Sequence, residues 1–221
     1  MASAVEEIRK MWSIFPVGED NPLSLRAIRA KHLGGRVINY SFTAGEFPNI
    51  EDRKKAFEAE ALRLNAASYN VYIVMNPIRP GFCGTAVCDS DIESRALLLI
   101  DLDRAVKADA PATDAEIEDA ASLGDQVAAY LKGYGWDDPI RVMSGNGIHL
   151  YYRLDGLPND EGSKELVGQL LRSLAAKFNN ASTHIDTSVF NASRITKVPG
   201  TIARKGVEAK ERPYQMAQVV E

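Results

Sequence analysis

Three acidic residues, one histidine and a group of cations are the side chains of this sequence best suited to chemistry. Asp101 and Asp103 end the stretch RALLLIDLD (95–103), in which five apolar residues run without a break. Side chains alternate between the two faces of a strand, so both aspartates share one face and Leu102 takes the other. Carboxylates this close repel each other, and a bound divalent cation removes that repulsion.

Hard carboxylate oxygens suit Mg²⁺ and Mn²⁺, which makes Asp101 and Asp103 candidate metal ligands. The alternative is a strand that ends at the surface, where both aspartates are solvated and have no function. The Asp-x-Asp pattern alone does not decide between these two interpretations.

A second candidate site is the turn in MSGNGIHLYY (143–152). The strand after this turn is expected to bury one set of side chains and to present the other to a cleft: Ile148, Leu150 and Tyr152 in the core, with Gly147, His149 and Tyr151 opposite. His149 could then contact a ligand, and backbone N–H groups near Ser144 could meet phosphate oxygens. The simpler alternatives are a structural histidine with hydrogen-bonded nitrogens and an ordinary hairpin turn.

A third segment, HIDTSVFNASRITKVPGTIARKG (184–206), contains one more acid and several cations: Asp186, Arg194, Lys197, Arg204 and Lys205. From Arg194 to Arg212 there are six basic and two acidic residues, in a chain whose formal net charge is −4. Fixed cations near glycine and proline turns are suited to binding a triphosphate. Solvated surface charges, clustered by chance, are the alternative.

These residues require strands and helices to position them, and the apolar pattern predicts both. Strands are expected over 36–42, 70–77 and 95–103, on both sides of the turn within 139–154, and near 213–220. Helices are expected over 21–35, 49–67, 113–132 and 163–178, the third opening with a Thr-x-x-Glu capping box. The mixture predicts an α+β fold with a mostly antiparallel or mixed sheet.

Length and composition are those of an ordinary water-soluble domain. The chain has 221 residues, of which 45% are apolar and 25% charged. It contains no apolar run of the roughly 18 residues that a membrane span needs, and its N-terminus lacks the apolar block of a signal peptide. We therefore expect a cytoplasmic protein without a membrane partner. Cys83 and Cys88 would supply only half of a zinc site, so no structural zinc is expected.

In their order along the chain, LLLIDLD, SGNGIHLYY and HID…NASRITKVPGT resemble the motifs of the archaeo-eukaryotic primase superfamily. The resemblance is to the primase-polymerase domains of phages, plasmids and other mobile elements. The Asp-x-Asp motif corresponds to Asp101 and Asp103, the motif that ends in histidine to Gly147 and His149, and the final acid to Asp186. Gly147 stands where serine is common, and Ser144 is the candidate to supply that hydroxyl.

The resemblance implies a single catalytic domain over residues 1–221. A small N-terminal α/β module (about 1–90) would be fused to a catalytic sheet like that of RNA-recognition motifs (about 91–221), with the active site in the cleft between them. It also implies DNA-templated nucleotidyl transfer, in primer synthesis or extension, from NTPs or dNTPs. Two Mg²⁺ or Mn²⁺ ions would be held by Asp101, Asp103 and Asp186.

The same resemblance assigns nucleotide binding to six residues: Ser144, Gly147, His149, Arg194, Lys197 and Lys205. The implied partners are a single-stranded DNA template and a primer, with a helicase domain or protein as a further partner. Two alternatives stay open. One is a non-catalytic replication initiator of the same fold, and the other is a nucleotide-sugar transferase, which also uses Asp-x-Asp with a metal.

Overall fold

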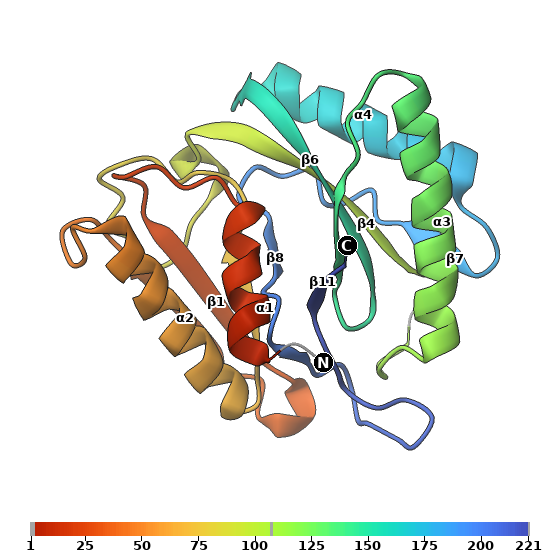
Figure 1. Cartoon of the computed structure of the whole chain (residues 1–221), viewed down its shortest axis with the longest axis horizontal. Coiled ribbons are helices and arrows are strands. Elements are labelled where there is room, and N and C mark those ends of the chain that lie inside the picture. The colour runs from red at the N-terminus through yellow and green to blue at the C-terminus, as the bar shows by residue number, and fades with distance from the viewer. Residues whose placement is uncertain (1–2, 107, 221) are drawn as a thin grey trace.

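Two antiparallel sheets and the helices around them form the framework of the protein (Figure 1). The computed structural model describes residues 3–106 and 108–220. Over these residues it contains four α-helices, a four-stranded sheet, a five-stranded sheet and a short two-stranded ribbon. The expected α+β class with antiparallel sheets is therefore confirmed.

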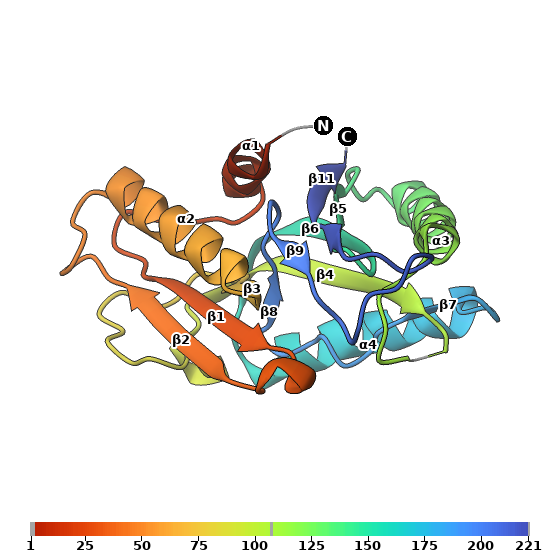
Figure 2. The same cartoon turned by 90° about the horizontal axis from the view of Figure 1, so that it is seen from below.

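The first sheet has the strand order β2-β1-β3-β8 and is antiparallel throughout. Its strands are β1 (Leu23–Arg29), β2 (Val37–Phe42), β3 (Tyr69–Val74) and β8 (Ile195–Lys197). Helix α2 (Ile50–Ala66) packs against β1, β2 and β3, with Phe57, Ala61 and Leu64 fully buried. Figure 2 shows α2 lying along one face of this sheet.

The second sheet has the order β11-β5-β6-β4-β7. Its strands are β4 (Ser94–Arg104), β5 (Ile140–Met143), β6 (Gly147–Pro158), β7 (Thr183–Ile185) and β11 (Gln218–Val220). Helix α3 (Asp114–Gly133) packs against β4, β6 and β7, and α4 (Glu161–Phe178) packs against β7 and α3. The ribbon consists of β9 (Ile202–Ala203) and β10 (Gln215–Met216).

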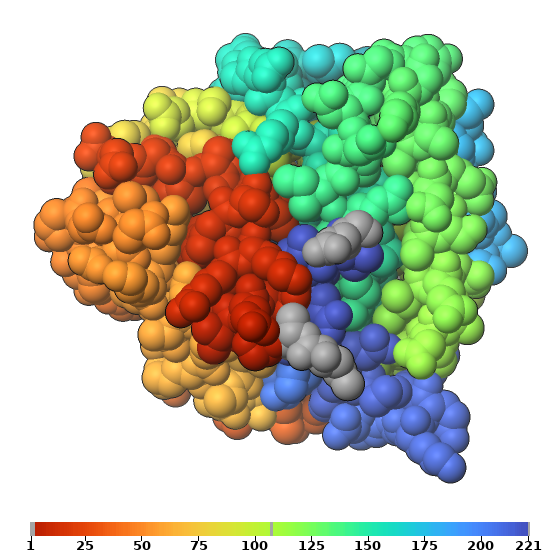
Figure 3. Space-filling model, in the orientation of Figure 1, coloured from red at the N-terminus to blue at the C-terminus, as the bar shows by residue number. Residues whose placement is uncertain are grey.

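The chain crosses between the two sheets more than once. Strand β8 comes from the C-terminal half of the sequence and yet pairs with β3 in the first sheet. Helix α1 (Ala4–Lys10) lies beside β11, and the buried carboxylate of Glu7 accepts a hydrogen bond from the Val219 backbone N–H at 2.8 Å. In Figure 3 these first and last described segments share one continuous surface. The proposed submodule boundary near residue 90 stays a prediction.

Most of the predicted elements are present, including the long helix that begins at Asp114 with the capping box of Thr113 and Glu116. The helix predicted over 21–35 is wrong, since this stretch forms β1 and a single 3₁₀ turn, Lys31–Leu33. Leu23, Leu25 and Ala27 are buried while Arg26 is exposed, which is the period of a strand. The strand pairs on both edges, and these tertiary hydrogen bonds override the local helix propensity.

The described helices offer no candidate membrane span, because none combines sufficient length with sufficient apolar character.

The core beneath the second sheet should be sensitive to lost volume at Leu150. This side chain is 0% exposed in β6, on the face that α3 covers. We expect Leu150→Ala to lower the free energy of unfolding by about 2–5 kcal/mol, measured by urea denaturation. Leu166→Ala is the matched control, because Leu166 is 57% exposed on α4 and its loss should cost less than about 0.5 kcal/mol. Equal losses in the two variants would contradict the placement of this core.

Candidate active site

The register between β4 and β6 brings the predicted acidic and histidine motifs together. Asp101 lies directly opposite His149, and Asp103 lies directly opposite Gly147. Leu102, between the two aspartates, is fully buried on the helix-covered face. Both carboxylates therefore lie on the opposite face of the sheet, as the alternation of side chains along a strand requires.

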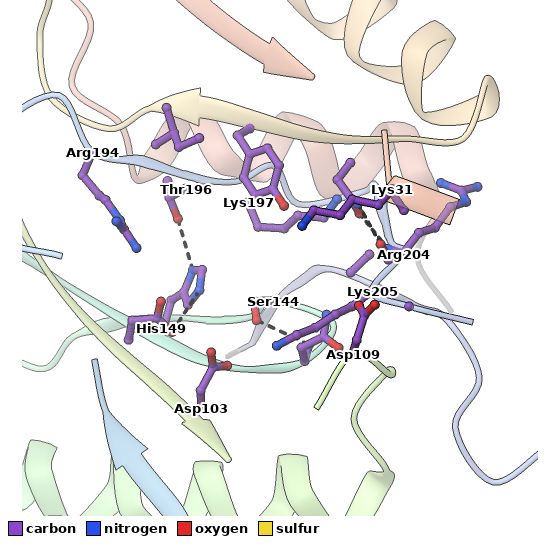
Figure 4. A pocket seen from close by; sticks show the side chains of 18 of the residues that line it. Lys31, Asp103, Asp109, Ser144, His149, Arg194, Thr196, Lys197, Arg204 and Lys205 are labelled. Carbon is purple, nitrogen blue, oxygen red and sulfur yellow. Dashed lines mark hydrogen bonds and ion pairs between the residues drawn. The ribbon is translucent and has the colours of Figure 1, made fainter. Parts of the chain in front are cut away.

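This face borders a cleft of about 660 Å³ between the two sheets. Seven of the predicted site residues line it: Asp101, Asp103, Ser144, His149, Arg194, Lys197 and Lys205. Figure 4 shows Arg194, Thr196 and Lys197 along one wall, with Asp103, Ser144 and His149 across from them. The first wall belongs to β8 and its flanks, and the second to the five-stranded sheet.

The Asp101 carboxylate is largely buried and poorly satisfied. Its Oδ1 has no hydrogen-bond partner among the described residues, and His149 Nε2 lies 3.5 Å from it. Burial, followed by repulsion from Asp186, raises the pKa of Asp101 to about 6. Burial and the charge of Asp101 raise the pKa of Asp103 to about 6 as well. The chain thus holds two aspartates at a place where their charged forms are disfavoured.

The third predicted acid lies beside this pair rather than facing the cleft. The Asp186 N–H donates to the Asp101 carbonyl at 2.8 Å, and Arg194 Nη2 lies 3.8 Å from Asp186 Oδ2. Asp186 is close enough to influence the pKa of Asp101, although it is absent from the lining of the cleft. Within 3–106 and 108–220, no three His, Cys, Asp or Glu side chains converge closely enough to hold a metal ion by themselves.

Asp101 and Asp103 nevertheless fit a divalent cation. A bound cation would pair with the unpartnered Oδ1 of Asp101, and it would offset the burial and the neighbouring negative charges that raise both pKa values. Mg²⁺ typically takes only one or two carboxylates from a protein and completes its octahedron with water and substrate phosphates. Two carboxylates facing an open cleft suit that mode of binding.

The hairpin turn is held together by its own polar groups. Ser144 Oγ accepts hydrogen bonds from the N–H groups of Asn146 and Gly147, at 3.4 and 3.2 Å, and donates to the Gly147 carbonyl. The Gly145 N–H is directed at Met143 Sδ. These backbone donors are already engaged, which leaves them poorly placed for the predicted phosphate contact. A role for Ser144 and Gly147 in binding a nucleotide stays a prediction.

Of the cations in the cleft wall, Lys197 is buried and Arg204 is partly buried. Lys197 Nζ donates to the Ile202 carbonyl at 3.1 Å, and burial together with the charge of Arg204 lowers the pKa of Lys197 to about 7. Arg204 Nη1 is buried without a hydrogen-bond partner. Neither side chain has an ion-pair partner among the described residues. An anion in the cleft would compensate both charges.

Sequence reasoning missed several residues of the cleft, among them Lys31, Tyr72, Thr196 and Arg204 as a binding residue. Lys31 falls in the stretch that was wrongly predicted to be helical. Thr196 stands between two predicted binding residues in SRITK, so its position could have suggested it. Tyr72 lies in the middle of a correctly predicted strand, and nothing in its local sequence distinguishes it.

No model of a known protein family matches the chain, and no curated protein matches it in sequence. Solved structures do match. The AEP domain of the primase-polymerase (PrimPol) of cyanophage S-2L superposes with a TM-score of 0.57 at 17% identity, covering 98% of this chain and 89% of that one. The chain has the fold of a primase-polymerase catalytic domain.

A second similar structure is the catalytic domain of the primase Repb' in complex with initiator DNA. It superposes with a TM-score of 0.50 at 16% identity and covers 100% of this chain and 85% of that one. The primase-polymerase fold therefore extends over the whole chain, and the resemblance inferred from the three motifs is confirmed at the level of the fold.

Because β6 approaches β4 closely, even the smallest side chain at position 147 is expected to destabilise the protein. A Cβ at this position would overlap the Leu102 carbonyl oxygen and lie 2.7 Å from Asp103 Oδ1. We expect Gly147→Ala to destabilise the protein by about 1–3 kcal/mol, measured by chemical denaturation, because the two strands must separate. In the control Gly133→Ala, a Cβ would meet nothing within 4 Å, and stability should not fall. A stable Gly147→Ala variant would contradict the strand register.

The raised pKa of Asp101 predicts a stability that depends on pH. From its ordinary value of 3.8, the pKa of Asp101 rises to about 6 in the folded chain. The folded state therefore binds the proton more tightly than the unfolded state does. The destabilisation caused by the charged carboxylate is absent below pH 4, grows between pH 4 and pH 6 and stays constant above pH 6. At pH 8 and without divalent metal, Asp101→Asn should be more stable than wild type by up to about 3 kcal/mol.

Thermal unfolding of both proteins at pH 4 and pH 8 measures this difference. It should shrink toward zero at pH 4, and added Mn²⁺ should stabilise the wild type more than Asp101→Asn. An Asp101→Asn variant that is less stable than wild type at pH 8 would show that the carboxylate is well satisfied without a cation.

Proposed function

We propose that this chain catalyses DNA-templated nucleotidyl transfer, making primers or extending them from NTPs or dNTPs in DNA replication, in the setting of a mobile element. The observation that carries the proposal is the pairing of Asp101 with His149 at the edge of a cleft whose other wall presents Arg194 and Lys197. Carboxylates at one side and cations at the other are the groups that a metal-bound nucleoside triphosphate requires.

In this proposal Asp101 and Asp103 would hold the divalent cation, and Asp186, which lies beside Asp101, adds to their negative charge. Bound Mg²⁺ or Mn²⁺, in a two-metal arrangement, would activate the primer 3′-hydroxyl and stabilise the charge that develops on the α-phosphate. His149 offers a ring N–H to the phosphates. Arg194, Lys197 and Lys205 provide fixed positive charge that compensates the triphosphate.

The proposed partners are a single-stranded DNA template and its primer. The catalytic domain of the primase Repb', which shares the fold, has been solved with initiator DNA. In this acidic chain four cations of the basic segment 194–212 line the cleft, namely Arg194, Lys197, Arg204 and Lys205. The phosphate backbone would therefore meet positive charge locally, at the cleft, rather than over the whole surface. A helicase as a further partner remains part of the proposal.

The central experiment is nucleotide incorporation on a primed single-stranded template with Mn²⁺ or Mg²⁺ and labelled dNTPs or NTPs. Replacing both Asp101 and Asp103 with Ala should reduce incorporation at least about a hundredfold, because the charge stabilisation at the reacting phosphate is lost. A double variant of Glu118 and Asp119 to Ala, which removes the same charge from the exposed face of α3, should retain activity.

Two other outcomes would replace the proposal. Metal-independent binding of DNA with no incorporation by the wild type would identify a replication initiator built on the same fold. Selective binding of a nucleotide-sugar in preference to a free triphosphate would favour a sugar transferase. Undiminished incorporation by the Asp101 and Asp103 double variant would refute the assignment of the site.

A further inference from the structure

A triangle of hydrogen bonds joins the two sheets at the floor of the cleft. His149 Nδ1 lies 3.1 Å from the Tyr151 hydroxyl and 3.2 Å from Thr196 Oγ1, and the two hydroxyls are also hydrogen-bonded to each other. His149 and Tyr151 belong to β6 of the five-stranded sheet, whereas Thr196 belongs to β8 of the other sheet. Figure 4 shows Thr196 pointing across the cleft to the imidazole.

All three side chains are buried, so water does not compete for these bonds. The Tyr151 ring is also fixed by edge-to-face packing against Phe15, with 5.7 Å between ring centroids. Within the described part of the chain, neither hydroxyl has any partner outside the triangle. The hydrogens of the triangle must therefore be distributed among these three atoms alone.

The number of hydrogens available in the triangle favours one tautomer of the His149 ring. If Nδ1 carries no hydrogen, one hydroxyl donates to Nδ1 and the other donates to the first hydroxyl, which uses both hydroxyl hydrogens. If Nδ1 carries a hydrogen, it occupies one oxygen, and one hydroxyl hydrogen is left buried without an acceptor. The first arrangement is therefore favoured, and a neutral ring in that state carries its hydrogen on Nε2.

We propose that Tyr151 and Thr196 are positioning residues that hold His149 with Nδ1 as an acceptor and with its Nε2–H directed toward the Asp101 side of the cleft. In that state Nε2 carries a hydrogen and has no lone pair for a metal. It lies 3.5 Å from Asp101 Oδ1 without a hydrogen bond to it, so this donor is available to an anionic ligand. A phosphate oxygen of the nucleotide is the acceptor expected there, and this part rests on the proposed function.

The link to β8 gives the triangle a second consequence. Thr196 is flanked by Arg194 and Lys197, which line the same cleft. Because Thr196 is hydrogen-bonded to both His149 and Tyr151, the triangle directs the His149 donor into the same cleft as these two cations. We therefore expect the triangle to act on the binding of a nucleotide more than on the rate of the chemical step.

The test is a pair of isosteric substitutions, Tyr151→Phe and Thr196→Val, made singly and together. Either single variant leaves one hydroxyl that can donate to Nδ1, so the nucleotide KM should change by less than about threefold. The double variant leaves Nδ1 without a donor, and KM should rise about tenfold or more, with kcat changed far less. Non-additivity of this kind is the signature of a shared acceptor.

Tyr152→Phe with Thr183→Val is the matched control. Both residues are buried, and both hydroxyls lack a hydrogen-bond partner, so their removal should leave KM unchanged. The ring state is measured separately by ¹⁵N NMR of the imidazoles, since the chain has only three histidines. In the wild type, His149 should have an unprotonated Nδ1 and a protonated Nε2. In the double variant this tautomer should no longer be preferred.

A hydrogen on Nδ1 of His149 in the wild type would overturn the inference, as would a double variant that matches the control pair in KM and in ring state. The NMR measurement needs no activity. If the wild type incorporates no nucleotide, the proposed function fails while the spectra still decide whether Tyr151 and Thr196 position His149.

Discussion

The burial of two like charges on one strand is the constraint on which the rest of the site depends. Asp101 and Asp103 project from β4, whose apolar run is buried in the core, and helix α3 packs against that strand. The strand is therefore held in place at the point where burial and repulsion disfavour the charged carboxylates. Such a site gains free energy when a cation arrives, because the folded chain has already met the cost of bringing the charges together.

The other wall of the cleft has the opposite imbalance, because the buried Lys197 and the partly buried Arg204 have no anionic partner among the described residues. Direct contact between the two walls would cancel both imbalances, but the strands keep them apart on either side of the cleft. A ligand that is both cationic and anionic at its two ends would satisfy both walls at once. A nucleoside triphosphate with its metal has this character, which explains why one cavity can combine such different groups.

Much of the fold and part of the site could be predicted because their signals are local. The run of apolar residues before Asp101, the capping box at Thr113 and the glycine turn before His149 each specify their own element. The first strand was mistaken for a helix because its identity depends on pairing with β2 and β3. Thr196 was missed for a similar reason, since its contact with His149 exists only after β8 has joined the first sheet. Contacts of this kind have no pattern in the sequence around either partner.

The placement of β8 also has a consequence for how the protein is made. The first sheet is built mainly from residues 23–74, yet its last strand is synthesised more than a hundred residues later. Until then the open edge of β3 exposes unpaired backbone groups, which on an emerging chain can pair with the wrong strand. The ribosome thus delivers the strand that carries Thr196 and Lys197 long after the other strands of its sheet, and the cationic wall and the completed sheet form in the same step.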